Sequence, residues 1–186
     1  MNVVYARRVI YDIPIRTIDG KPTSLRTYEG KVLLVVNVAS QCGLTPQYEQ
    51  LEALHERFAS RGLAVLGFPA NEFGAQEPGS NAEIAEFCST KFGVKFPMFE
   101  KIVVKGAGQH PLYAELVAEQ PRAAGDVEGF RKQLRGYGID PGGADEITWN
   151  FEKFLVDKAG NAIARFAPSM TPDDPQLVGA IERALG

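Results

Sequence analysis

Two apolar segments without polar alternation constrain the fold of this chain more than any other feature of its sequence. They span residues 32–38 and 63–68 and are rich in β-branched residues. Strands that are covered on both faces have this composition. The apolar residues between the two segments recur at helical spacing: Tyr48, Leu51, Leu54 and Phe58. Gly62 is a natural end to that helix, and the order strand, helix, strand predicts parallel strands with a right-handed crossover.

The rest of the chain indicates further elements around this unit. We predict additional strands at residues 9–17, 151–156 and 162–166, an extended segment at 96–104, and a lead into the central strand at 25–29. Asp19-Gly20 is a hairpin turn signal, and Ser80-x-x-Glu83 resembles a capping box that opens a helix. Two more helices are expected, one from Pro111 to about Glu119 and one over 173–185. The sequence therefore predicts an α/β fold with a central mixed β-sheet flanked by helices on both faces.

The length of 186 residues suits a single domain. Residues from about 120 to 147 differ from the rest because they contain many glycines and charges, and only 127–134 have weakly helical character. A core strand follows this segment. We therefore interpret it as a surface insertion within one domain that spans residues 1–186.

Composition and charge exclude several functions. The formal net charge of −3 argues against general nucleic-acid binding. No apolar run approaches the roughly 20 residues that cross a bilayer, and the first residues have no signal-peptide pattern. The two cysteines and two histidines are far apart without zinc-binding spacing, so we expect no metal and no cofactor. We predict a cytoplasmic protein without stable membrane insertion.

Cys42 is the first candidate for chemistry. It lies between the strand at 32–38 and a helix that we expect to open at Thr45-Pro46, with Thr45 as the N-cap and Pro46 in the first turn. The free N–H groups and the dipole of a helix N-terminus favour a negative charge. A thiolate at Cys42 would therefore be stabilised and reactive.

Three stretches of the sequence resemble the motifs of one known family. They are NVASQCGLT at residues 37–45, FPANEFGAQEPG at 68–79 and WNFEKF at 149–154. In their order and spacing they resemble the cysteine-type, bacterial-like members of the glutathione peroxidase family. The resemblance implies a thioredoxin-like fold, reduction of hydroperoxides, and an active-site tetrad of Cys42, Gln76, Trp149 and Asn150.

The residue types in this tetrad suit peroxide reduction. The nucleophile must be a thiolate, and the leaving oxygen must be stabilised and protonated. Gln76, Trp149 and Asn150 offer neutral N–H donors that can stabilise both charges with little reorganisation. Attack on hydrogen peroxide or an organic hydroperoxide would leave Cys42 as a sulfenic acid.

Cys88 has two interpretations, a resolving thiol that forms a disulfide with Cys42 or a core residue on an apolar helical stripe. Relatives that use a resolving cysteine in this helix often carry it one residue nearer to the Phe-Pro that corresponds to Phe96-Pro97. One residue turns a side chain by about 100° around a helix. A second cysteine favours thioredoxin as the reductant, while glutathione could react directly with the sulfenic acid.

Other functions and roles stay open at this stage. The chain could be a peroxide sensor or relay that passes oxidation to a partner protein thiol, or a non-catalytic binding module with a thioredoxin fold. Asn71 could support the site or bind loop backbone. The insertion is most simply a solvated surface, although some family members use this region to form oligomers. A monomer is slightly favoured.

Overall fold

The computed structural model describes residues 10–186, and a mixed β-sheet lies at its centre. Within these residues the sheet has four strands in the order β4–β3–β5–β6. β3 (Val32–Val38) and β4 (Leu63–Pro69) are parallel, with Val32 opposite Leu63. β5 (Lys153–Val156) is antiparallel to β3, and β6 (Ala162–Phe166) is antiparallel to β5. The predicted mixed sheet and its parallel pair of strands are confirmed.

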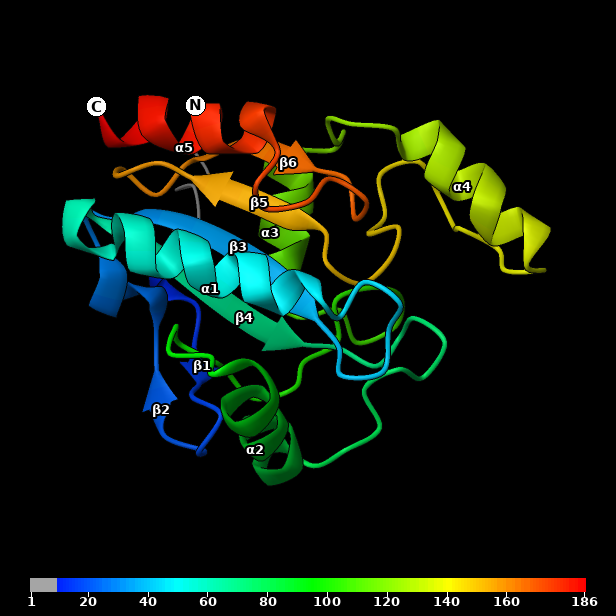
Figure 1. Cartoon of the computed structure of the whole chain (residues 1–186), viewed down its shortest axis with the longest axis horizontal. Coiled ribbons are helices and arrows are strands. Elements are labelled where there is room, and N and C mark those ends of the chain that lie inside the picture. The colour runs from blue at the N-terminus through cyan, green and yellow to red at the C-terminus, as the bar shows by residue number, and fades with distance from the viewer. Residues whose placement is uncertain (1–9) are drawn as a thin grey trace, which may run out of the picture.

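Helix α1 (Gln47–Phe58) connects the two parallel strands, as the apolar spacing predicts. It continues as a 3-10 turn over Ala59–Arg61 and stops at Gly62, whose left-handed φ of 102° favours glycine. α1 passes in front of the sheet, and α3 (Pro111–Glu119) passes behind it (Figure 1). Every residue of β3 and β4 is buried, because both faces of this part of the sheet are covered.

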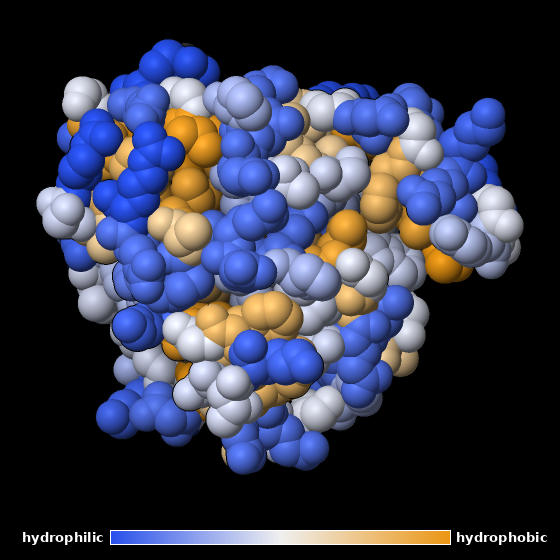
Figure 2. All heavy atoms as spheres, viewed as in Figure 1, coloured by the Kyte–Doolittle hydropathy of each residue, from blue (hydrophilic) through white to orange (hydrophobic). Residues whose placement is uncertain are grey.

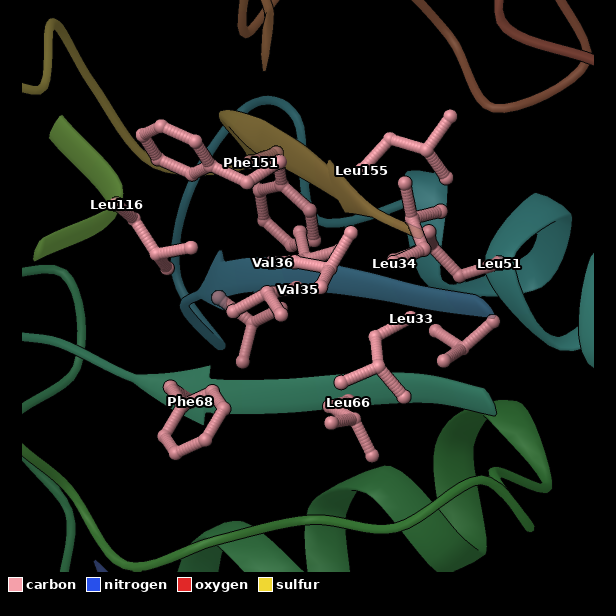
Figure 3. Close-up of a cluster of buried hydrophobic side chains, with 14 of the residues drawn as sticks. Leu33, Leu34, Val35, Val36, Leu51, Leu66, Phe68, Leu116, Phe151 and Leu155 are labelled. Carbon is pink, nitrogen blue, oxygen red and sulfur yellow. The ribbon is translucent and has the colours of Figure 1, made fainter. Parts of the chain in front are cut away.

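The core forms where side chains from the sheet meet the helices on either side (Figure 3). The strands contribute aliphatic residues and Phe68, and the helices contribute Leu51 from α1 and Leu116 from α3. All three of these helix and strand residues are fully buried. The apolar runs in the sequence therefore mark the residues that hold the sheet between its two helical layers.

The remaining helices begin and end close to the expected residues. α2 spans Asn81–Phe92, and both hydrogen bonds of the predicted capping box between Ser80 and Glu83 are present. α4 spans Val127–Gly136, and α5 spans Pro175–Leu185 with Asp174 as its N-cap. α5 thus starts two residues later than we predicted. No helix within the described residues has the length and apolar character to cross a membrane.

The predicted strand at residues 9–17 is wrong for most of its length. Ile10–Asp12 forms a 3-10 turn, and only Ile15–Arg16 (β1) pairs as a strand, with Pro22–Thr23 (β2). Pro14 has no N–H to donate, so a regular ladder cannot continue through it. The hairpin turn between β1 and β2 contains Asp19-Gly20, as predicted. Residue 9 lies outside the described residues.

Two other predicted segments lie next to the parallel strands. Residues 25–29, which we predicted only to lead into the central strand, form a 3-10 turn over Leu25–Tyr28 ahead of β3. Residues 96–104 make only isolated bridges, and they lie along the outer edge of β4. There the N–H of Gly67 donates to the carbonyl of Pro97, and the N–H of Phe99 donates to the carbonyl of Gly67, both at 3.0 Å. These bonds satisfy part of the edge that the sheet would otherwise expose.

The segment at 120–147 carries α4, which projects from the body of the molecule (Figure 1). Both ends of this segment are bound to Arg165 of β6. Its guanidinium donates to the carbonyls of Gln120, Asp145 and Glu146 at 2.9–3.1 Å. Arg165 is 3 % exposed, so a buried side chain holds the base of the projecting segment.

Candidate active site

Cys42 lies in the loop between β3 and α1, but the predicted cap of that helix is wrong. α1 begins at Gln47, and Pro46 occupies the N-cap position without a side-chain bond. The hydroxyl of Thr45 instead accepts a hydrogen bond from the Cys42 N–H at 2.9 Å and donates to the Ala39 carbonyl at 2.8 Å. Threonine hydroxyls often bond nearby backbone in this way in place of capping a helix. Thr45 therefore fixes the shape of the cysteine loop.

The sulfur of Cys42 accepts a hydrogen bond from the backbone N–H of Leu44 at 3.3 Å. Cys42 is 8 % exposed, so this donor lies in a site with little water around it. An N–H aimed at sulfur stabilises the negative charge of a thiolate. Sequence inspection missed Leu44 because the donor is backbone and leaves no signature in the residue type.

Gln76 lies in the loop after β4 and is bound to the cysteine loop. Its carbonyl accepts a hydrogen bond from the N–H of Gln41, the residue before Cys42, at 3.0 Å. Its side-chain Oε1 accepts a hydrogen bond from the Nδ2 of Asn150 at 2.9 Å. Asn150 is fully buried. Because Oε1 is engaged by Asn150, the side-chain orientation leaves the NH₂ of Gln76 as a donor for other groups.

Trp149 packs against the loop after β4 that carries Gln76. Its ring lies 5.6 Å from the ring of Phe73, and a Cβ on Gly74 would lie 3.4 Å from the indole. That distance is an ordinary van der Waals contact, and it is the φ of 68° at Gly74 that favours glycine there. The structure thus brings the loop around residue 42, the loop around residue 76 and the turn at 149–150 together through these hydrogen bonds and ring contacts.

Asn37 holds the Trp149–Asn150 turn against β3, and sequence inspection did not assign it this role. Its Nδ2 donates to the Trp149 carbonyl at 3.1 Å, and its own carbonyl accepts from the N–H of Phe151 at 2.7 Å. Phe151 has a φ of 65°, which ends the ladder and makes β5 begin at Lys153, two residues later than predicted. The sequence did carry one signal of this role, because Asn37 is a polar residue within an otherwise apolar strand.

A buried ion pair between Glu152 and Arg165 lies next to the turn that carries Trp149 and Asn150. Glu152 Oε1 accepts from the N–H of Thr148 at 3.3 Å, and its Oε2 lies 2.6 Å from a guanidinium nitrogen of Arg165. Burial raises the pKa of Glu152, and the charge of Arg165 opposes that rise. The ion pair therefore links the turn that carries Trp149 and Asn150 to β6.

Asn71 supports the loop that carries Gln76. Its Oδ1 accepts a hydrogen bond from the N–H of Glu77 at 2.9 Å. Glu77 is itself 1 % exposed, and burial raises the pKa of its carboxyl, while Ser40 beside it lowers that pKa. Of the two roles left open for Asn71, the structure shows a bond to loop backbone.

Cys88 lies on α2, is 2 % exposed and faces Tyr48 of α1. Burial raises the pKa of its thiol to about 11, which the adjacent Tyr48 hydroxyl only partly offsets. Both cysteines are free thiols. A thiol with this pKa is almost entirely protonated at neutral pH, so Cys88 is unreactive in this conformation.

Comparison with known proteins identifies the family. Residues 10–117 match the family described as glutathione peroxidase. The chain is 52% identical to the thioredoxin/glutathione peroxidase BtuE of Escherichia coli over 172 residues, which cover 92% of this chain and 94% of the relative. This chain belongs to the glutathione peroxidase family. It is a peroxidase, an oxidoreductase that acts on peroxides.

A second relative of this peroxidase is the hydroperoxy fatty acid reductase gpx1 of Synechocystis, 47% identical over 97% of this chain and 98% of the relative. The crystal structure of T. cruzi GPX1 is 33% identical in sequence. It covers 96% of this chain and 97% of its own, with a TM-score of 0.69. A thioredoxin-family thiol:disulfide interchange protein from Chlorobium tepidum has 19% identity and a TM-score of 0.58 over 94% of this chain and 93% of its own. The fold is therefore thioredoxin-like, as expected.

Proposed function

We propose that this peroxidase reduces hydrogen peroxide and organic hydroperoxides through a sulfenic acid on Cys42. The thiolate sulfur attacks one oxygen of the O–O bond, so an S–O bond forms while the O–O bond breaks. The second oxygen leaves as water or an alcohol after it takes the proton that the thiol has given up. The sulfur is oxidised by two electrons and the peroxide is reduced by two.

The hydrogen-bond chain from Gln41 through Gln76 to Asn150 supports this proposal most strongly. It joins neutral amide donors to the loop of the nucleophile, and Trp149 adds an indole N–H from the same turn. Such donors stabilise the thiolate first and the leaving oxygen next, without a proton transfer of their own. We assign Gln76, Trp149 and Asn150 this role.

Regeneration would begin when a thiol attacks the sulfenic acid, forming a disulfide and releasing water. We propose Cys88 as that thiol and thioredoxin as the preferred reductant, whose dithiol becomes a disulfide as it reduces the Cys42–Cys88 bond. The presence of two cysteines and the name of the Escherichia coli relative support this choice. Glutathione is the alternative reductant. Because Cys88 is buried, its helix must loosen before the bond can form.

We also propose a cellular compartment, an oligomeric state and a domain organisation for this peroxidase. We place the reaction in the cytoplasm, where thioredoxin keeps thiols reduced. We expect the protein to act as a monomer and as one domain, with residues 120–147 as an insertion. The Synechocystis relative is named a hydroperoxy fatty acid reductase. The organic hydroperoxides that we propose as substrates therefore include those of fatty acids.

Stopped-flow mixing with peroxide tests the proposal. Cys42→Ser should lose the single-turnover reaction, whereas Cys88→Ser should keep it and lose turnover with thioredoxin. Gln76→Ala should slow Cys42 oxidation by about 100-fold, because one preorganised donor is worth roughly that factor. Gln133→Ala, an exposed glutamine on α4, is the matched control. Unchanged oxidation in Gln76→Ala would contradict the assigned role, and unchanged thioredoxin turnover in Cys88→Ser would contradict the two-cysteine scheme.

A mixed-disulfide trap separates this function from a peroxide relay. Cys88→Ser prevents the internal disulfide, so partner thiols that attack Cys42 should accumulate as mixed disulfides. Thioredoxin as the main trapped protein would support a peroxidase, and a different dominant partner would favour a relay.

A further inference from the structure

A pocket of about 220 Å³ lies between the loop of Cys42 and helix α2. Its walls include Gln41, the residue before Cys42, and Phe87, the residue before Cys88. The two cysteines themselves do not line the pocket in this conformation. The pocket therefore lies between the two segments that must approach each other if a disulfide is to close.

Glu77 lines the same pocket from the loop after β4, one residue beyond Gln76. It is 1 % exposed, and its carboxyl oxygen Oε2 has no hydrogen-bond partner among the described residues. The hydroxyl of Ser40, which also lines the pocket, is buried and without a partner in the same part of the chain. A buried carboxyl with an unpaired oxygen destabilises a fold, and buried groups of this kind are candidates for chemistry.

Backbone bonds hold the loop around Glu77 in place. The N–H of Glu77 donates to the Oδ1 of Asn71 at 2.9 Å, and its carbonyl accepts from the Nζ of Lys101 at 2.8 Å. The same Nζ donates to the carbonyl of Gly79 at 2.6 Å. None of these bonds uses the carboxyl of Glu77. The side chain can therefore gain or lose a proton while the loop keeps its shape.

Cys88 packs against Tyr48 of α1, in apolar surroundings. Tyr48 is fully buried, and its ring lies 5.5 Å from the ring of Phe92, one turn beyond Cys88 on α2. Figure 2 shows hydrophobic atoms at the surface between these two helices. Burial raises the pKa of the Cys88 thiol most, and the charge of Glu77 raises it further. The thiol therefore needs a proton acceptor before it can react, and the charge of Glu77 already acts on it.

We propose that Glu77 accepts the proton of Cys88 when the disulfide with Cys42 forms. The Cys88 sulfur attacks the sulfur of the Cys42 sulfenic acid, so that an S–S bond forms and the S–O bond breaks. The thiol proton moves to the Glu77 carboxylate and from there to the leaving hydroxide, which becomes water. Formally, the Cys42 sulfur gains one electron and the Cys88 sulfur loses one. The proposal rests on the resolving role proposed for Cys88 and adds the base that the step requires.

The surroundings of Glu77 suit a base. Burial raises the pKa of its carboxyl, which strengthens the carboxylate as a proton acceptor, while Ser40 and the charge of Lys101 lower that pKa and favour the ionised form. Glu83 is the other carboxyl that lines the pocket. It is exposed and accepts a hydrogen bond from the hydroxyl of Ser80 at 3.0 Å in the capping box of α2. Glu77 is therefore the better placed of the two.

Rapid-quench mixing with hydrogen peroxide separates the two chemical steps. Mass spectrometry after thiol blocking distinguishes the Cys42 sulfenic acid from the Cys42–Cys88 disulfide, which has lost one water. Glu77→Gln should slow disulfide formation about 100-fold, as expected for loss of a general base, and the sulfenic acid should accumulate. Glu77→Asp should retain part of the rate because it keeps a carboxylate. Glu86→Gln is the matched control, because Glu86 is an exposed carboxyl of α2 that does not line the pocket.

The pH dependence of disulfide formation distinguishes a base from a residue that only shapes the loop. In the wild type the rate should rise as Glu77 ionises, through a pKa above the usual value of 4.5, and then level off. In Glu77→Gln the rate should keep rising toward the thiol pKa of about 11. Identical pH profiles of Glu77→Gln and the wild type would overturn the proposal. So would equal slowing in Glu86→Gln, or a loss in Cys42 oxidation as large as the loss in disulfide formation.

Failure of the proposed function would look different. A wild-type protein that forms the sulfenic acid but no Cys42–Cys88 disulfide would refute the resolving role of Cys88, and the role of Glu77 would be refuted with it. A wild-type protein whose Cys42 does not react with peroxide would refute the proposed function itself.

Discussion

Arg165→Met should test whether the ion pair with Glu152 holds both the fold and the candidate site. Arg165 is 3 % exposed and Glu152 is fully buried. The Nε of Arg165 donates to Glu152 at 2.9 Å, and a second guanidinium nitrogen lies 2.6 Å from the same oxygen. Methionine replaces the aliphatic part of the side chain but leaves the carboxylate of Glu152 buried without its charged partner.

The expected loss is large because an unpaired charge would stay in the core. Removal of one partner of a buried pair costs about 3–5 kcal/mol, compared with a total free energy of unfolding of about 5–15 kcal/mol for a domain. Arg122→Met is the control, because Arg122 pairs with Asp145 at the surface. The decrease in the free energy of unfolding of Arg122→Met should stay below about 1 kcal/mol. Urea unfolding, followed by the fluorescence of the single tryptophan, measures both variants.

The loss of stability in Arg165→Met should depend on pH in a defined direction. Burial already raises the pKa of Glu152 above its usual value, and removal of Arg165 should raise the pKa further. A carboxyl with a raised pKa in the folded state favours folding below its unfolded pKa, and that contribution is lost as pH rises through the folded pKa. The deficit of Arg165→Met should therefore shrink as the pH falls toward 4.5, the ordinary value for glutamate.

A double variant separates stability from catalysis. Glu152→Leu combined with Arg165→Met leaves no unpaired charge, so much of the lost stability should return. The N–H of Thr148 would still lack its acceptor, and the turn that carries Trp149 and Asn150 would be less firmly held. Oxidation of Cys42 by peroxide should therefore stay slow. The reasoning is refuted if Arg165→Met is no less stable than Arg122→Met, or if the double variant is as unstable as the single one.

Three further predictions follow from individual side chains. In Cys42→Ser, iodoacetamide should modify Cys88 only slowly at pH 7, because its thiol has a pKa of about 11; rapid labelling in the folded protein, detected by mass spectrometry, would contradict this. Burial lowers the pKa of Lys153 to about 7, so its contribution to stability is present above pH 10.5 and is lost as the pH falls through 7; Lys153→Met should flatten this dependence in urea titrations from pH 6 to 10. Thr45→Val should cost about 1–3 kcal/mol, because the Cys42 N–H and the Ala39 carbonyl lose a partner, whereas Thr45→Ser should be nearly neutral by the same assay.

The architecture could be predicted where a local pattern and the tertiary environment agree. The apolar runs became β3 and β4 because strands buried on both faces need no polar alternation. The Ser80 capping box opened α2 because its two bonds need only residues three positions apart. The motifs around Cys42, Gln76 and Trp149 were found because the family resemblance lies in the residue types themselves.

The parts that failed depend on backbone or on distant partners. Thr45 bonds the cysteine loop instead of capping α1, and both uses suit a threonine equally well. The left-handed φ of Phe151 cannot be inferred from a phenylalanine in an apolar run. The roles of Asn37 and Arg165 required the fold, because each binds a segment that is remote in the chain.

The two bonds between Gly67 and the Pro97–Phe99 segment have a consequence for the catalytic cycle. This segment follows α2, the helix that must loosen if Cys88 is to reach Cys42. Since the segment is fastened to β4 by its own backbone, α2 can unwind while the border of the sheet stays occupied. A second molecule would then find this edge of β4 already paired, so unwinding of α2 need not start edge-to-edge aggregation there during repeated oxidation and reduction.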